Sequence, residues 1–343
     1  MGTLGIGHDP CAAMKTNIRL RPGETLELVF LLGMADRADR VRELVEPFQN
    51  LKKAKAALDE VKGFWQEKLR TIRVNTPDPA MNILLNGWLL YQAISCRIWA
   101  RTAFYQAGGA FGFRDQLQDS LSLLAVWPEL VKNQIVKHAQ HQFLQGDVLH
   151  WWHEPAGKGT RTRFSDDYLW LPYVTAEYVR ATGDYELLKT EVPFLDDELL
   201  KKFEDERYCQ PRVTDETAPV FDHCIRAIEY GLRFGERGLP LMGGGDWNDG
   251  MNTVGNGGKG ESVWLGWFLC TVLQKFIPVC REMGDHGRAE RYCKIIEDVA
   301  EAIEKNAWDG NWYKRAFFDN GTPLGSVNNK ECKIDSLAQS WAV

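Results

Sequence analysis

One short segment of this 343-residue chain combines residues that can handle sugars and protons. The string Gly243-Gly244-Gly245-Asp246-Trp247-Asn248-Asp249 places two carboxylates and an indole directly after three glycines. Glycines favour a tight turn that lets the backbone approach a ligand closely. The Trp247 ring suits stacking on a sugar, and Asp246 or Asp249 could supply a proton to a reacting oxygen. A calcium loop is the alternative, although its aspartate spacing does not fit an EF-hand.

A second polar cluster follows the glycine-rich residues 105–112. Arg114, Asp115, Gln118 and Asp119 come at the predicted N-terminus of a helix, where they could donate to and accept from sugar hydroxyls. The alternative interpretation is a capped helix with a surface ion pair.

A third segment, His150-Trp151-Trp152-His153-Glu154, precedes a basic stretch at 158–163 and the pair Asp166-Asp167. Adjacent tryptophans suit a sugar platform, and the basic residues suit an anionic substrate. A solvated surface loop explains the segment equally well. The three-residue histidine spacings (138 and 141, 150 and 153) could suggest metal ligands, but we interpret them as helix and loop histidines without a metal.

Helices are the elements that must position these segments. Asp78-Pro79 is an N-cap followed by proline at the first helical position. Apolar periodicity then predicts helices near 115–126, 129–144, 166–182, 219–234, 262–283 and 286–306, with another starting at Asp335. Without intervening runs of parallel strands, this order predicts an all-α toroid whose loops carry the chemistry.

The first part of the chain has a different pattern. Residues 15–35 alternate around the turn Pro22-Gly23, which predicts a β-hairpin. A lone hairpin is not stable, so we expect it to belong to a sheet whose other strands precede the chain. Residues 36–73 are charged and amphipathic, which predicts a linker of one or two helices.

Composition excludes some classes of partner. A formal charge of -6 without a basic run argues against nucleic acid. The longest apolar run, residues 263–273, is shorter than the roughly 20 residues that cross a bilayer, so we expect no membrane segment. Eight cysteines without C-x-x-C spacing are interpreted as reduced core residues of a cytoplasmic protein.

Residues 105–119, 243–251 and 257–264 resemble glycoside hydrolase family 94, which includes cellobiose and chitobiose phosphorylases. The resemblance implies that residues 1–35 end a β-sandwich, that 36–75 form a helical linker, and that 76–343 form an (α/α)6 catalytic barrel, incomplete at its C-terminus. The expected fold is thus mostly α.

The resemblance also implies inverting phosphorolysis of a β-glucosidic bond in an oligosaccharide, which gives α-glucose 1-phosphate. Asp249 matches the family's general acid, Trp247 and Asp115 match donor-sugar ligands, and Arg101 matches the phosphate-facing arginine. Arg114 and Asp246 complete the predicted substrate-binding set. Inorganic phosphate is the co-substrate, and no metal or organic cofactor is implied. The candidate assembly is a homodimer.

This sequence departs from the family in one loop. The cellobiose and chitobiose enzymes carry a second arginine where this chain has Gly108-Gly109-Ala110. The loop is closer to the branch of β-1,2-oligoglucan phosphorylases and the C-terminal domain of cyclic β-1,2-glucan synthases, which favours a β-1,2-glucan. The family's phosphate-binding histidines and Thr-Gly pair would follow Val343, so we expect the chain alone to be inactive.

Two alternatives stay open. The same barrel could be an inverting hydrolase, with Asp166, Asp167, Glu154 or Glu261 as the base that activates water. The chain could also be a non-catalytic glucan-binding module of a cyclic glucan synthase.

Overall fold

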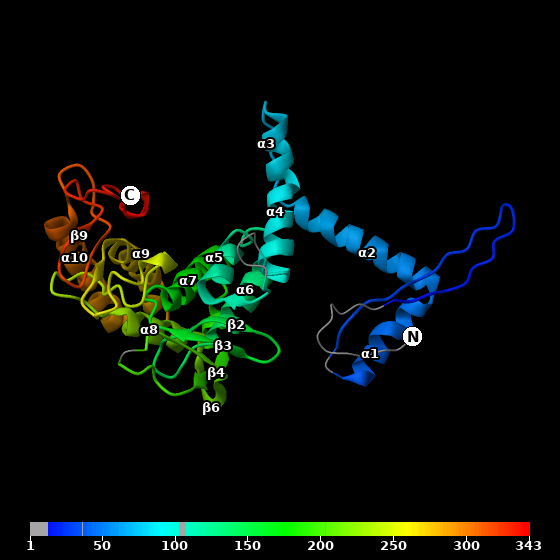
Figure 1. Ribbon diagram of the computed structural model, residues 1–343, viewed down its shortest axis with the longest axis horizontal. Coiled ribbons are helices and arrows are strands. Elements are labelled where there is room, and N and C mark those ends of the chain that lie inside the picture. Colours follow the sequence, from blue (N-terminus) through cyan, green and yellow to red (C-terminus); the bar gives the residue numbers. More distant parts are fainter. Residues whose placement is uncertain (1–12, 36, 103–107, 203) are drawn as a thin grey trace. The chain divides into compact units, whose positions relative to one another are not determined.

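The computed structural model describes residues 13–35, 37–102, 108–202 and 204–343. The chain divides into two compact units, residues 1–67 and 68–343. Helices predominate along the chain from α1 to α11, and strands are short (Figure 1). The prediction of a mostly helical protein is therefore confirmed.

The first unit contains the predicted helical linker. Helices α1 (Ala38–Val45) and α2 (Leu51–Leu69) are joined by the 3-10 turn η1 (Glu46–Gln49), and none of their residues is buried. Residues 13–35 are extended around a turn in which the Glu24 amide donates to the Arg21 carbonyl, and no strand is assigned to them. The predicted hairpin thus has its turn but not its ladder, because two strands without a larger sheet are only marginally stable.

The second unit begins with a long helical rod. Asp78 caps it as predicted, since its carboxylate accepts from the amides of Ala80 and Met81. The rod comprises α3 (Pro79–Ile83), the π-type turn η2 (Leu84–Trp88), α4 (Leu89–Gln92) and the π-type turn η3 (Ala93–Trp99).

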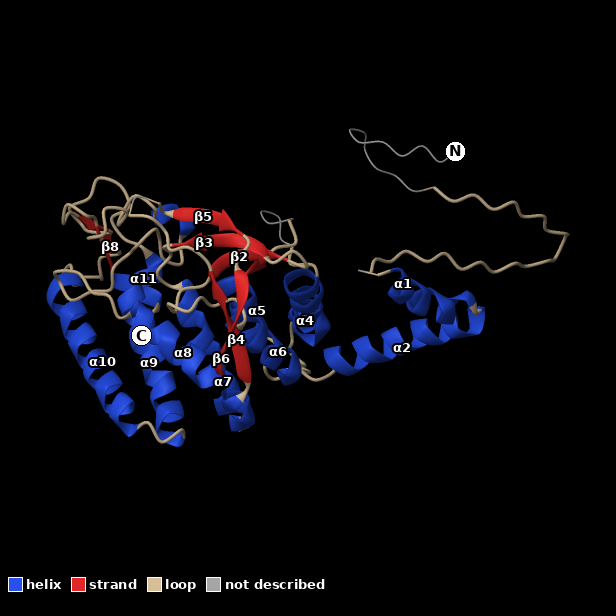
Figure 2. Ribbon diagram, turned by 90° about the horizontal axis from the view of Figure 1, so that it is seen from below, coloured by secondary structure: helices blue, strands red, loops and turns tan. Residues whose placement is uncertain are grey.

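All six helices predicted after the rod are present. They are α5 (Phe113–Leu121), α6 (Pro128–Ala139), α7 (Trp170–Thr182), α8 (Val220–Gly231), α9 (Val263–Glu282) and α10 (His286–Ala307). A short helix α11 (Ser336–Ser340) follows the predicted cap Asp335. Helices α7–α10 run side by side, and the connections that carry the candidate residues gather near their ends (Figure 2).

Several connections that were predicted to be loops contain strands. Their bounds are β1 (Phe111–Gly112), β2 (Leu149–His153), β3 (Lys158–Thr162), β4 (Glu191–Asp196), β5 (Glu206–Cys209), β6 (Arg212–Pro219), β7 (Glu261–Ser262), β8 (Ala316–Phe317) and β9 (Pro323–Leu324). They form three antiparallel sheets in the orders β1-β2-β3-β5, β4-β6 and β7-β8-β9.

The main hydrophobic core lies among α5–α10. Fully buried members include Phe113, Ile135, Leu171, Trp264 and Phe276. Helix α9 continues nine residues beyond the apolar run counted in the sequence, so it is long and apolar enough to cross a membrane by length and composition alone. Because 72% of its most apolar window is buried inside the unit, α9 is placed as a core helix.

The seven described cysteines are free thiols, and Cys224 and Cys280 are buried between core helices. Burial raises the pKa of Cys224 to about 12 and that of Cys280 to about 11. Both are therefore protonated, unreactive core groups at neutral pH. The cytoplasmic location and the homodimer stay predictions.

Candidate functional site

The glycines before Asp246 are required by the backbone that they contact. Gly243 and Gly245 have positive φ values of 62° and 155°. A Cβ atom on Gly243 would collide with the carbonyl of Arg163, and one on Gly245 would meet the Phe164 ring at 2.6 Å. The Ser165 amide donates to the Gly245 carbonyl at 2.9 Å. The predicted tight turn is thus present, and it is pinned to the chain that leads into α7.

Asp246 is built into the protein interior rather than facing an open pocket. Its carboxylate has no exposed surface and accepts from both terminal nitrogens of Arg315, at 2.6 and 2.7 Å. The Ser262 hydroxyl donates to it at 2.7 Å. Predicted as a sugar ligand, Asp246 instead anchors the loop in this structure, because its oxygens are already occupied. The Arg315 guanidinium also fills the place that a calcium ion would need beside this carboxylate.

Asp249 faces the opposite way. Its side chain is 62% exposed and forms an ion pair with Arg114. It lines a cavity of about 440 Å³ with other residues from four stretches of the chain: His150, Trp151, Phe164, Asp205, Glu206, Gly244 and Asn252. The structure therefore leaves the predicted general acid accessible to a substrate.

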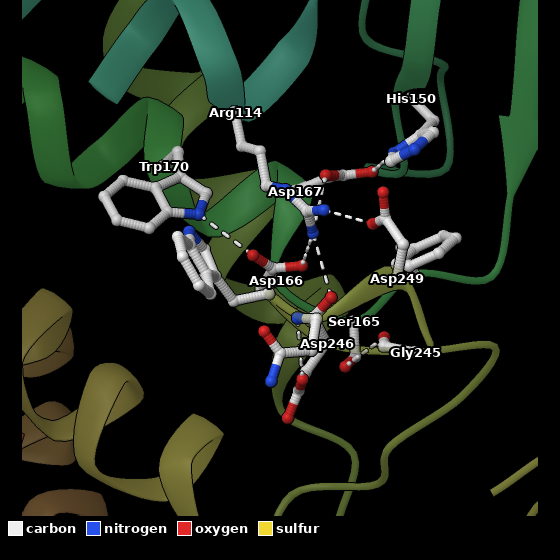
Figure 3. Close-up of polar contacts among 12 residues, drawn as sticks. Arg114, His150, Ser165, Asp166, Asp167, Trp170, Gly245, Asp246 and Asp249 are labelled. Carbon is white, nitrogen blue, oxygen red and sulfur yellow. Dashed lines mark hydrogen bonds and ion pairs between the residues drawn. The ribbon is translucent and has the colours of Figure 1, made fainter. Parts of the chain in front are cut away.

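Arg114 connects the loops around this cavity. Figure 3 shows its guanidinium donating to the Asp166 carboxylate and the Asp246 carbonyl, each at 2.9 Å, and to Asp249. The side chain is only 8% exposed. Burial alone would lower the pKa of Arg114, but Asp166, Asp167 and Asp249 outweigh it and raise that pKa. Arg114 is thus a fixed positive charge directly behind Asp249.

Asp166 and Asp167 hold the inner side of the cluster. Burial raises the pKa of Asp166 to about 7, against the opposing effect of Arg114. Its other oxygen accepts from the Trp170 indole at 3.1 Å. Asp167 lies 2.7 Å from Nδ1 of His150. Burial would lower the pKa of His150, but the Asp167 carboxylate outweighs it and raises that pKa.

Asp115 and Trp247 both lie near the first turns of α5. The Asp115 carboxyl is half-buried, and burial raises its pKa. It folds over Gly112, where any Cβ atom would collide with it. Trp247 is 40% exposed, and its indole N–H donates to the side chain of Gln118 at 3.1 Å. An exposed indole face beside α5 leaves Trp247 free to contact a ligand.

Arg101 lies apart from the acid. Its guanidinium donates to the backbone carbonyls of Gly109 and Trp99, at 2.9 and 2.8 Å, and stacks on Phe111 at 4.1 Å. It lines a second cavity of about 200 Å³ with Gly108–Ala110, Gly112, Trp151 and His153. Trp151 is common to both cavities. Residues 103–107, the start of the predicted glycine loop, lie outside the described residues.

The two adjacent tryptophans have separate roles. Trp152 is fully buried and stacks on His141, with ring centroids 3.8 Å apart. Trp151 points to the other face of strand β2 and lines both cavities. Because successive strand residues face opposite sides, the strand assignment alone would have separated them.

Two of the four predicted hydrolytic bases, Glu261 and Glu154, are held in ion pairs and do not line the Asp249 cavity. Glu261 is fully buried and forms an ion pair with Arg237 at 2.9 Å. Glu154 pairs with Lys137 at 2.7 Å. The carboxylates that share the cavity with Asp249 are Asp205 and Glu206, which were not predicted because no motif in the sequence surrounds them. In the described part of the chain, no group of three or more metal-ligating side chains forms a candidate metal site.

The connections of this mostly helical fold gather three carboxylates, one indole and an imidazole around the accessible Asp249 cavity, a set of groups that suits the binding of a sugar. Residues 64–343 match the model of the Glycosyl hydrolase 94 superfamily, catalytic domain, and residues 1–51 match the Glycosyl hydrolase 94 supersandwich domain. The chain belongs to glycosyl hydrolase family 94.

Curated relatives agree with this assignment. The chain is 45% identical over 342 residues to cyclic beta-(1,2)-glucan synthase NdvB of Rhizobium meliloti (strain 1021). It is 31% identical over 355 residues to solabiose phosphorylase of Paenibacillus borealis, and 27% identical over 368 residues to N,N'-diacetylchitobiose phosphorylase of Vibrio proteolyticus. These matches cover 99%, 99% and 98% of this chain but only 12%, 41% and 43% of the relatives.

Proposed function

We propose that this chain carries the sugar-cleaving site of an inverting β-glucoside phosphorylase, with Asp249 as the general acid. The observation that carries the proposal is the accessibility of Asp249. Six carboxylates were predicted from the sequence as a possible acid or base, and Asp249 is the one among them that lines the cavity of about 440 Å³. The phosphorylases among the family-94 relatives support phosphorolysis as the reaction class.

In the proposed reaction, Asp249 transfers its proton to the departing glycosidic oxygen as the bond from that oxygen to the anomeric carbon breaks. An oxygen of inorganic phosphate forms the new bond to that carbon from the opposite face, so the product is an α-sugar 1-phosphate. Arg114 then stabilises the Asp249 carboxylate that proton transfer leaves behind. Its bonds to Asp166 and to the Asp246 carbonyl hold the guanidinium ready for this role.

We propose that Trp247 and Asp115 bind the donor sugar and that Arg101 faces phosphate. The exposed Trp247 ring supports the first assignment. The position of Arg101 beside the cavity next to Trp151 supports the second, although its bonds to Gly109 and Trp99 would have to be exchanged for phosphate. An (α/α)6 barrel is the proposed architecture, supported by the adjacent helix pair α9 and α10 and by the family match.

We propose a β-1,2-linked glucan as the substrate. The 45% identity to a cyclic beta-(1,2)-glucan synthase supports this linkage over those of the more distant phosphorylases. Because the chain spans a minority of each relative's length, the activity belongs to the whole protein.

Hydrolysis is the second candidate, and one observation favours it. Asp205 and Glu206 line the same cavity as Asp249, so a carboxylate that could activate water is within the site. A non-catalytic glucan-binding module is the third candidate.

The deciding experiment incubates the full-length protein with β-1,2-, β-1,3- and β-1,4-gluco-oligosaccharides, with and without inorganic phosphate. Phosphorolysis requires phosphate-dependent release of glucose 1-phosphate from one linkage. Sugar release without phosphate would replace the proposal with hydrolysis, and Asp205→Asn should then stop the reaction. Binding without turnover would leave the glucan-binding module.

A further inference from the structure

A cavity that the proposed mechanism does not use lies beside the glycine turn that precedes Asp249. Its volume is about 280 Å³, and its lining includes Arg163, Lys202, Arg233, Asp205, Gly243 and residues 255–258. It shares Asp205 with the Asp249 cavity and no lining residue with the cavity beside Arg101. Three cations and one carboxylate give it an excess of positive charge in a chain whose formal charge is -6, and such an excess attracts anions.

One of these cations, Arg163, belongs to the basic stretch that follows the paired tryptophans in the sequence. Arg161 of the same stretch is buried and paired with Asp147 at 2.7 Å. Arg163 instead donates to the backbone carbonyls of Glu204 and Lys201, at 2.8 and 2.7 Å. Among the described residues it forms no ion pair with a carboxylate. Its guanidinium is thus fixed in position while its positive charge is not neutralised by another side chain.

Arg233, just after α8, is the second cation without an ion pair in the described part of the chain. Its guanidinium lies 4.2 Å from the centre of the Tyr230 ring and 3.5 Å from the Tyr168 hydroxyl. Burial raises the pKa of both tyrosines, so both are uncharged at neutral pH. Arginine binds phosphate oxygens through two parallel N–H groups, and two unneutralised arginines in one cavity therefore suit a phosphate group.

The glycine-rich part of the lining is held in shape by the protein itself. A Cβ atom on Gly255 would lie 2.7 Å from the side chain of Met242. The Gly257 amide donates to Asp319 at 2.8 Å, and the Gly258 amide donates to the Gly255 carbonyl at 2.9 Å. The cavity is therefore formed before a ligand enters. Its volume is near the lower limit of small-molecule sites, roughly 300 Å³, which suits phosphate or a sugar phosphate rather than an oligosaccharide.

We propose that this cavity binds a phosphate group, of inorganic phosphate or of a sugar phosphate, at a site additional to that of the phosphate co-substrate. Arg163 and Arg233 bind the phosphate oxygens, and Lys202 adds a third positive charge. The bound group connects three segments of the chain. Because Gly243 begins the turn that leads to Asp249, an occupied site stabilises that turn. The inference does not depend on which reaction the Asp249 cavity carries out.

The test titrates the full-length protein with inorganic phosphate by calorimetry, at constant ionic strength and without an oligosaccharide, so that no reaction occurs. Lys202→Gln combined with Arg233→Gln removes two exposed cations and should weaken this binding about 10-fold or more. Phosphate should also raise the melting temperature of this variant less than that of the wild type. Arg180→Gln combined with Lys189→Gln, the matched control, removes the same two kinds of charge outside the cavity and should change neither result.

Equal phosphate affinity in the wild type and the cavity variant would overturn the site. A parallel titration with α-glucose 1-phosphate distinguishes the two sources of the phosphate group. Binding that is tighter than that of inorganic phosphate, and that the cavity variant loses, would assign the site to a sugar phosphate. Equal or weaker binding would assign it to free phosphate.

Kinetics separate this site from that of the co-substrate. The KM for phosphate in phosphorolysis should be unchanged in the variant with Lys202→Gln and Arg233→Gln. A KM that rises in step with the lost affinity would place the co-substrate in this cavity and overturn the additional site. If the wild-type protein shows no phosphorolysis, the proposed function fails and Arg101→Gln replaces the kinetic test. It should keep the binding that the cavity variant loses, and loss of that binding in Arg101→Gln alone would overturn the inference.

Discussion

Asp246 and Asp249 are three residues apart in the chain and occupy opposite sides of one loop. Asp246 has no exposed surface and is held by Arg315 and Ser262, whereas the Asp249 side chain is 62% exposed and pairs with Arg114. Both aspartates are next to an arginine, so an ion pair by itself does not identify a working carboxylate. The difference in exposure separates the group that fixes the loop from the group that can reach a substrate.

The strongest test of this comparison removes the proton donor. Asp249→Asn keeps the size of the side chain but cannot donate a carboxyl proton, so the rate should fall about 10²- to 10⁴-fold with the melting temperature unchanged. Steady-state kinetics and thermal denaturation on the full-length protein measure the two effects. Asp215→Asn, an exposed change on β6, is the matched control. A variant that keeps its rate would show that Asp249 is not the acid.

The buried aspartate should behave in the opposite way. Asp246→Asn leaves the guanidinium of Arg315 buried beside a neutral group, with Asp335 at 3.7 Å as its remaining carboxylate. We expect the free energy of unfolding to fall by about 3 kcal/mol. Chemical denaturation of the second unit in the full-length protein measures this loss. Unchanged stability with a lost rate would instead make Asp246 part of the chemistry.

A third test uses Asp166, whose contribution to the stability of the folded state should depend on pH. It contacts Arg114 and Trp170, and the charges of Asp167 and Asp246 also act on it. Its folded pKa of about 7 lies above its usual value, so the folded state binds a proton that the unfolded state releases. The stability from this group is complete below pH 4 and is lost as pH rises through 7, by up to about 1.4 kcal/mol per pH unit.

Asp166→Asn should therefore flatten the decline in stability between pH 5 and 8, because the amide does not titrate. Denaturation curves across this range measure the slope. The raised pKa of His150 acts in the same direction, since its contribution is lost as pH rises above 6.5, so a residual slope should persist. An unchanged slope in Asp166→Asn would show that Asp166 is ionised throughout.

The smallest expected effect concerns the glycine loop that follows Asp249. Asp319 accepts from the amides of Gly257, Lys259 and Gly260, each at 2.8 Å, and these bonds help to lower its pKa although partial burial opposes them. In Asp319→Asn the acceptor is no longer a charged carboxylate, so these hydrogen bonds weaken. The free energy of unfolding should fall by about 1 kcal/mol at neutral pH. The difference should be complete above pH 4 and should shrink as pH falls below 4 through the lowered pKa of Asp319, where the wild-type carboxyl becomes protonated. Calorimetric melting at two pH values tests both statements.

The local sequence pattern was sufficient to predict the helices and the glycine-dependent turn before Asp246. The six helices after the rod, the caps at Asp78 and Asp335 and the need for glycine before Asp246 follow from spacing and backbone sterics, which act over a few residues. The prediction of a hairpin was wrong because local pattern was not sufficient there. Its alternation is a local signal, but its ladder needs further strands that the described residues do not supply.

Roles within the site were decided over long sequence separations. The segment at 243–249 predicted two interchangeable carboxylates, and only the approach of Arg315 and Arg114 from positions 69 and 135 residues away assigned one to the interior and one to the cavity. Likewise, the sequence did not distinguish the two adjacent tryptophans. In the structure, strand β2 directs Trp151 toward the cavity and Trp152 into the core. The sequence by itself determined which residues could do chemistry, because residue type and local spacing carry that information. Tertiary packing decided which of them do, because burial and charge depend on neighbours that are distant in the chain.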